Sequence, residues 1–110
     1  MILQPGELIL VNVLFHQAAG SKVRPAVVLL DTLDDDFIAA PVTSRPRNSK
    51  FDLPVTDWKN AGLNVPSTIR FHKLTVLAKA EVIRVIGAPS DVDRKQMSRI
   101  LSEMFAEPIF

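Results

Sequence analysis

A chain of 110 residues with 47% hydrophobic and 23% charged residues has an ordinary globular composition, and residues 1–110 are enough for one domain with a single core. The 13 Lys and Arg against 12 Asp and Glu leave a formal net charge of +1, so any basic surface must come from clustering. The absence of cysteine excludes a disulfide framework, a thiol nucleophile and a thiolate metal site, and fits a reducing cytoplasm.

No segment of the sequence indicates secretion or a membrane. The first six residues lack the basic start and long apolar stretch of a secretion signal. No apolar run approaches the roughly 20 residues that a membrane-spanning helix needs. We therefore expect a cytoplasmic protein with no membrane partner.

The first half of the chain is expected to form short strands. Residues 7–15 alternate polar and apolar side chains, which predicts a first strand. Residues 26–31 and 37–43 are apolar runs joined by an acidic turn, and they predict a hairpin in the core of a small sheet. Residues 51–55 predict a fourth strand, which Pro54 would confine to an edge or a bulge.

The second half begins with a possible helical turn and continues with three more strands. Residues 56–62 have a capping residue at one end and a glycine at the other, which predicts one or two turns of helix. Residues 67–71, 75–78 and 81–87 complete the expected set of strands.

The clearest helix follows Ser90, which is a typical N-cap residue and precedes an acidic first turn. Many short strands with one terminal helix predict a mainly β, α+β fold in which a bent antiparallel sheet closes into a small barrel. One apolar stripe of the helix is expected to pack against this barrel rather than to bind a ligand. The stripe consists of Val92, Met97, Ile100, Leu101, Met104 and Phe105.

Arg24 and Pro25 lie between a small flexible run, residues 18–22, and the apolar strand at residues 26–31. Proline fixes its own φ and pushes the preceding residue towards an extended conformation, so we expect Arg24 at the mouth of a rigid strand, beneath a mobile loop. A guanidinium offers a planar fork of donors and keeps its charge, which suits the binding of a phosphate. The alternative is a surface arginine at a strand start.

Two other segments carry polar side chains that could join Arg24. Thr43 and Ser44 end a strand with paired hydroxyls, which could donate to a phosphate or only cap a turn. Arg70, His72 and Lys73 bring three basic groups together, and strand alternation places Arg70 and His72 on one face. His72 could instead point outward or satisfy a local hydrogen bond.

Several chemistries lack their residues in this sequence. There is no glycine-rich phosphate loop, no His-Glu-x-x-His motif and no nucleophile elbow, and His16 and His72 are the only imidazoles. We therefore expect no metal and no cofactor. Cations, hydroxyls and one histidine remain, and they suit RNA cleavage, in which the substrate supplies its own 2′-hydroxyl as the nucleophile.

Three segments resemble, in order and spacing, the PemK/MazF family of toxins from type II toxin–antitoxin systems, and the resemblance covers nearly the whole chain. The resemblance implies an SH3-like barrel, a homodimer and a cognate antitoxin that holds the toxin inactive. The three segments are Arg24-Pro-Ala-Val-Val-Leu, Pro41-Val-Thr-Ser and Gly62-Leu-Asn-Val-Pro-Ser with Arg70 and Lys73-Leu after it.

The resemblance also implies roles for single residues. Arg24 occupies the place of the family arginine that holds the scissile phosphate, and Thr43 matches the active-site threonine, with Ser44 as a second candidate. Arg70 matches an arginine proposed to act as an acid or a charge stabiliser. His72 stands where some members carry an aspartate proposed as the general base, and an imidazole, which titrates near neutral pH, can serve as a base there.

These matches predict a metal-independent endoribonuclease toxin that cuts single-stranded RNA and leaves a 2′,3′-cyclic phosphate and a 5′-hydroxyl. RNA contacts are expected from Ser44, Arg45, Ser67 and Lys73. The alternative is a module of the same barrel fold that binds nucleic acid or an antitoxin without cleaving, and the replaced aspartate is the main support for it. A small interaction domain unrelated to nucleic acid would leave Arg24, Thr43 and Arg70 unexplained.

Overall fold

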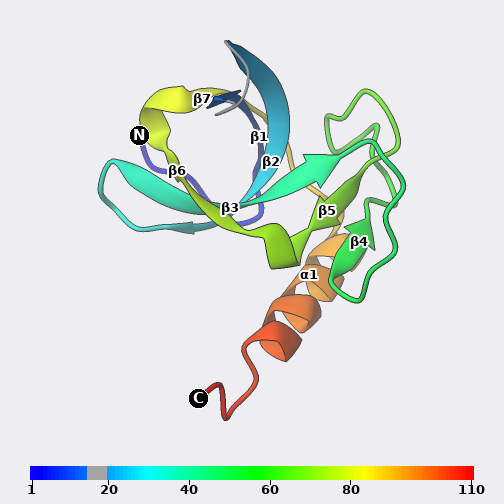
Figure 1. The fold of residues 1–110 in the computed structure, drawn as a ribbon. Coiled ribbons are helices and arrows are strands. Elements are labelled where there is room, and N and C mark those ends of the chain that lie inside the picture. The colour runs from blue at the N-terminus through cyan, green and yellow to red at the C-terminus, as the bar shows by residue number, and fades with distance from the viewer. Residues whose placement is uncertain (15–19) are drawn as a thin grey trace.

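Seven strands form one strongly curved antiparallel sheet in the computed structural model, which describes residues 1–14 and 20–110 (Figure 1). The hydrogen-bonded order is β4-β5-β3-β2-β1-β7, and β6 pairs with the first half of β3. The strands are β1 (Leu8–Leu14), β2 (Ser21–Asp31), β3 (Asp36–Thr43), β4 (Asp52–Pro54), β5 (Thr68–Arg70), β6 (Thr75–Ala78) and β7 (Val82–Gly87).

The central strands β1, β2 and β3 bury side chains on both faces, which explains their continuous apolar sequences. On β2, Val27 packs on one face while Ala26 and Val28 pack on the other. One face contributes to a helix-side core and the other to a strand-side core. The helix-side core consists of Leu8, Val27, Ala40, Val42, Val55, Ala61, Leu63, Ile69, Phe71, Met97 and Ile100, and the strand-side core of Leu3, Ile9, Val11, Ala26, Val28, Phe37 and Ala39.

The predicted hairpin of β2 and β3 is confirmed, and so is the edge position of β4, where Pro54 has no ladder to interrupt on its outer side. The predicted mainly β, α+β fold with one terminal helix is confirmed, but the sheet does not close into a complete barrel. In the described part of the chain β6 and β7 share no ladder, and a 3₁₀ turn at Lys79–Glu81 joins them. The backbone N–H of Lys79 donates instead to the carbonyl of Asp35, at 2.8 Å.

Of two local predictions in the second half, the helical turns fail and the strand is confirmed over a shorter range. Residues 56–62 form consecutive turns and not a helix. The Ala61 N–H donates to the carbonyl of Asp57, four residues back, but the Leu63 N–H donates to Trp58, five residues back, so the helical hydrogen-bond pattern does not continue. The strand expected at residues 67–71 ends at Arg70, and Phe71–Lys73 form a 3₁₀ turn.

Helix α1 (Asp91–Met104) begins as predicted, with the Ser90 hydroxyl accepting the N–H of Asp93 at 3.2 Å. The middle of the expected stripe is confirmed, since Met97 and Ile100 are buried. The ends of the stripe are wrong, because Val92 and Phe105 are 67% and 53% exposed.

Asp93 is buried in their place, at the start of α1. Its carboxylate accepts the backbone N–H of Thr56 at 2.8 Å and also the Thr56 hydroxyl. A paired carboxylate in the first turn satisfies otherwise free donors and complements the helix dipole, which makes its burial tolerable. No helix in the described ranges is long and apolar enough to cross a membrane.

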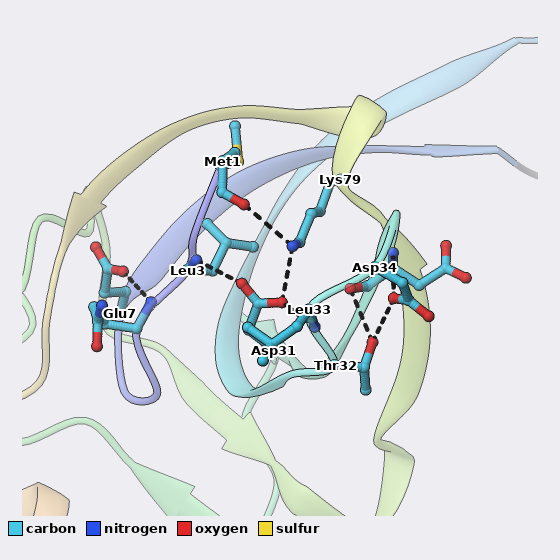
Figure 2. A network of polar contacts seen from close by, with 10 residues as sticks. Met1, Leu3, Glu7, Asp31, Thr32, Leu33, Asp34 and Lys79 are labelled. Carbon is cyan, nitrogen blue, oxygen red and sulfur yellow. Dashed lines mark hydrogen bonds and ion pairs between the residues drawn. The ribbon is translucent and has the colours of Figure 1, made fainter.

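Asp31 and Lys79 tie the amino-terminal segment to the sheet (Figure 2). The Lys79 ammonium lies 2.8 Å from Asp31 Oδ1 and donates to the carbonyl of Met1 at 3.1 Å, and the N–H of Leu3 donates to Asp31 Oδ2 at 2.9 Å. The hydrogen bond from Lys79, with those from the backbone of Leu3 and Leu33, lowers the pKa of Asp31 from 3.8 to about 2.

We expect the Asp31 contacts to stabilise the fold above about pH 4 and to be lost as the pH falls towards 2, because a depressed pKa favours folding only while the carboxylate stays charged. Melting temperatures of the parent and of an Asp31→Asn variant should therefore differ most near neutral pH and converge in acid. A constant difference between pH 7 and pH 2 would contradict this assignment.

Candidate functional site

Strands β2 and β3 separate at two prolines. Their ladder ends where Ala26 pairs with Pro41; beyond it, β2 continues beside β1 and β3 pairs with β5. Neither Pro25 nor Pro41 has an N–H to donate, so the residues at this point cannot extend a regular ladder. The divergence leaves an opening between the amino-terminal half of β2 and the end of β3.

Arg24 stands at this opening, although not in the position that the sequence predicts. Strand β2 begins at Ser21, so Arg24 lies within the strand, paired with Val11 of β1, rather than at the strand mouth. Its side chain is exposed and makes no hydrogen bond or ion pair with any residue that the structure describes. Of the flexible run expected at residues 18–22, residues 18 and 19 lie outside the described residues, whereas Ser21 and Lys22 belong to β2 and pair with β1.

A pocket of about 490 Å³, here called the cationic pocket, occupies the opening. Its polar lining consists of three arginines, Arg24, Arg45 and Arg47, and three hydroxyl residues, Thr43, Ser44 and Thr75. Its lining includes no carboxylate, so the field inside favours an anion. The apolar floor belongs to the strand-side core and includes Val11, Ala26 and Ala39.

Thr43 does cap a turn, because its Oγ1 accepts the backbone N–H of Arg45 at 3.1 Å. A hydroxyl has one donor and two acceptor positions, so this bond leaves the proton of Thr43 free to donate. The two sequence-based interpretations of Thr43 are therefore compatible. The turn fixes the oxygen at the pocket wall, and the proton can be given to an anion.

A second pocket of about 340 Å³ adjoins the cationic pocket, and Arg24, Pro25, Val42 and Ser44 line both. Ser67 lines this second pocket, but it is buried and donates its proton to the Val65 carbonyl at 2.9 Å. Sequence reasoning missed two further polar residues that line it, Asn64 and Arg84. Arg84 carries no motif signal, because a single charge in an alternating strand is common on any exposed sheet face.

Arg70 and His72 belong to a polar network that centres on Asp52. Arg70 Nε lies 2.9 Å from Asp52 Oδ1, and the backbone N–H and hydroxyl of Ser49 donate to Asp52 Oδ2 at 3.0 and 2.7 Å. Burial raises the pKa of Asp52, but the hydrogen bonds from Arg70 and Ser49 outweigh burial and lower it. Asp52 is thus a buried anion that fixes the guanidinium of Arg70.

Arg70 and His72 meet as predicted, with 3.2 Å between Arg70 Nη2 and His72 Nε2. The contact arises from the 3₁₀ turn after Arg70, not from strand alternation. A guanidinium only donates, so Nε2 accepts and the ring proton is assigned to Nδ1, which is buried and without a partner among the described residues.

The register relates this network to the cationic pocket. Thr43 pairs with Thr68, so Arg70, two residues further along β5, lies on the same face of the sheet as Thr43. Arg70 and His72 are nevertheless absent from the lining of both pockets, and so is Lys73, which is exposed. Within residues 1–14 and 20–110, no three His, Asp or Glu side chains gather closely enough to hold a metal ion.

Comparison with known proteins identifies the family. The model of the PemK-like, MazF-like toxins of type II toxin–antitoxin systems matches residues 4–105, and the chain therefore belongs to this toxin family. A comparison with curated protein sequences finds no significant match.

Solved structures of MazF proteins share the fold. The Mycobacterium tuberculosis toxin MazF-mt6 is 18% identical, with a TM-score of 0.73 over 90% of this chain and 95% of its own. A chain of the MazE-MazF structure from Deinococcus radiodurans is 18% identical, with a TM-score of 0.75 over 94% and 96%. A mycobacterial endoribonuclease in complex with its cognate antitoxin is 12% identical, with a TM-score of 0.73 over 97% and 98%.

Arg70 and Arg24 should differ in their effect on stability. Arg70→Ala leaves the Asp52 carboxylate buried without its cation, and we expect a loss of about 2 kcal/mol, less than for a fully buried pair because Arg70 is partly exposed. Arg24→Ala removes an exposed side chain and should change stability by less than about 0.5 kcal/mol. Urea unfolding of the two variants measures both values, and equal losses would show that Asp52 does not depend on Arg70.

Proposed function

We propose that this toxin is an endoribonuclease that cuts single-stranded RNA without a metal ion. The observation that carries the proposal is the cationic pocket, which is lined by three arginines and three hydroxyl residues and by no carboxylate. Two of the structures that share the fold bear the description endoribonuclease, which supports the same activity here.

In the proposed reaction the 2′-hydroxyl oxygen of the RNA attacks the adjacent phosphorus. A bond from that oxygen to phosphorus forms, and the bond from phosphorus to the 5′-oxygen breaks. The products are a 2′,3′-cyclic phosphate and a 5′-hydroxyl. Arg24 and the free proton of Thr43 bind the non-bridging phosphate oxygens, where negative charge grows as the phosphorane forms.

For the proton transfers we propose Arg70, which the register of β5 sets on the Thr43 face of the sheet, and His72, which contacts Arg70. His72 takes the proton of the 2′-hydroxyl, and to do so its Nε2 must exchange the Arg70 N–H for the substrate hydroxyl. Arg70, fixed by Asp52, acts as a charge stabiliser. A water molecule donates a proton to the 5′-oxygen as it leaves, and the resulting hydroxide takes up the proton that His72 received.

The biological setting proposed is the one that the family implies. The toxin acts in the cytoplasm as a homodimer, and a cognate antitoxin blocks it by covering the cationic pocket. The mycobacterial endoribonuclease that shares the fold is described as being in complex with its cognate antitoxin. Exposed Ile83 and Val85 on β7, 47% and 44% accessible, offer apolar surface for such partners.

One observation favours the alternative, a binding module that does not cleave. Arg70 occupies the Nε2 lone pair of His72, and Nδ1 is buried, so neither ring nitrogen is free to take a proton in this arrangement. Such a module would still bind RNA through the cationic pocket.

Single-turnover cleavage of end-labelled RNA tests the proposal. We expect Arg24→Ala and Thr43→Ala each to slow cleavage about a hundredfold, because each removes a donor aimed at developing charge. Cleavage by the parent should persist in excess EDTA and leave cyclic phosphate ends. Arg99→Ala is the matched control, because Arg99 is an exposed α1 arginine that lines neither pocket. Parental rates in both site variants would refute the assigned roles.

Variants of His72 test its role as the general base, and the activity of the parent separates the enzyme from the binding module. We expect His72→Gln to slow cleavage roughly a hundredfold, the usual contribution of a positioned base, and His72→Asp to keep part of the activity. RNA affinity should change little in both variants, because His72 lines neither pocket. If His72→Gln cleaves at the parental rate, the base role is wrong, and if the parent binds RNA without cutting it, the binding module is correct.

A further inference from the structure

The second pocket continues the cationic pocket around Arg24. The two lie on opposite sides of the β1-β2-β3 sheet at the place where β2 and β3 diverge, and Arg24 and Ser44 belong to both walls. Because Arg24 and Ser44 line both pockets, an extended chain that leaves the cationic pocket past Arg24 can enter the second pocket.

The lining of the second pocket combines an apolar floor with free polar groups. The floor includes Leu10, Leu63 and Ile86, and its volume of about 340 Å³ is near the lower end for ligand pockets, which suits one nucleoside. The Asn64 amide and the Arg84 guanidinium form no hydrogen bond or ion pair with any part of the chain that the structure describes.

The sheet fixes where Arg84 stands relative to Arg24. Leu10 of β1 pairs with Arg84 of β7 on one side and with Pro25 of β2 on the other. The backbones of Arg84 and Pro25 are thus two strand spacings of about 4.8 Å apart. Arg24 and Arg84 both line the second pocket, so their guanidinium groups can contact neighbouring phosphates of one extended strand.

We infer that the second pocket binds the first nucleotide beyond the two that the cleaved bond joins, with Arg84 on its phosphate and Asn64 on the edge of its base. This inference rests on the proposed function and adds a subsite to it. An amide offers both a donor and an acceptor to a base edge, whereas a guanidinium on a phosphate adds affinity without reading sequence.

The experiment measures the affinity of uncleavable oligonucleotides that copy a mapped cleavage site, with a 2′-deoxy sugar in place of the attacking ribose. The shortest spans only the cut bond, and longer ones add one nucleotide at either end. We expect one of the two extensions to raise parental affinity about tenfold, and Arg84→Ala to abolish most of that gain while binding the shortest oligonucleotide normally.

Salt dependence separates the two contacts. The extension that raises affinity should steepen the slope of log K against log salt by about 0.7 in the parent, because it adds one phosphate contact. In Arg84→Ala, which lacks that contact, the same extension should leave the slope unchanged. Asn64→Ala should keep the slope and lose the preference for the added base. Arg99→Ala, which removes the same charge from an arginine outside both pockets, should behave as the parent.

Two outcomes overturn the subsite. In the first, Arg84→Ala binds oligonucleotides of every length with parental affinity. In the second, it loses the same affinity at every length, which indicates only a long-range charge effect. A parent that cuts no RNA refutes the proposed function, and this inference falls with it. A parent that cuts RNA without an Arg84-dependent gain refutes the subsite alone.

Discussion

The separation of β2 from β3 at Pro25 and Pro41 is the constraint on which the candidate site depends. A sheet of hydrogen-bonded strands has no room between neighbours, because adjacent backbones lie less than about 5 Å apart. Two residues without N–H groups end the ladder here, and β3 turns to β5 while β2 stays with β1. The opening between them forms the cationic pocket, and Arg24 and Thr43 come from its two sides.

The double burial of β1, β2 and β3 keeps this opening in place. Alternate residues of β2 pack into the helix-side and strand-side cores. A register shift of one residue would therefore move each set of side chains into the opposite core, where it does not fit. Close backbone contact adds a further restraint, since Gly62 and Gly87 approach so closely that a Cβ at Gly62 would lie 2.1 Å from the Ile86 carbonyl oxygen. Each pocket therefore ends on a rigid core.

Some basic side chains are paired with a carboxylate of the protein, and others have no such partner among the described residues. Arg70 and Lys79 are each held by a carboxylate that is almost inaccessible, Asp52 and Asp31, and these pairs order β5 and the amino-terminal segment. Arg24 and Arg84 have no such partner among the described residues and line pockets. A cation without an internal anion remains available to an external one, which is why the exposed arginines, rather than the paired ones, define the binding surface.

The sequence by itself determined the local features of this protein. Alternation and apolar runs located most strands, Ser90 located the start of α1, and the Arg24-Pro25 and Thr43-Ser44 segments identified two sides of the cationic pocket, because such signals depend on neighbours along the chain. Only the tertiary structure decided what depends on distant partners. Strand pairing brings Asp52 to Arg70 and brings Arg84 to the second pocket. Asp93 is buried instead of Val92 because Thr56 lies opposite it. The sheet stays open because a turn, and not a ladder, joins β6 and β7. Hydrogen-bond partners far apart in sequence leave no periodic trace, so no reading of a single chain can supply them.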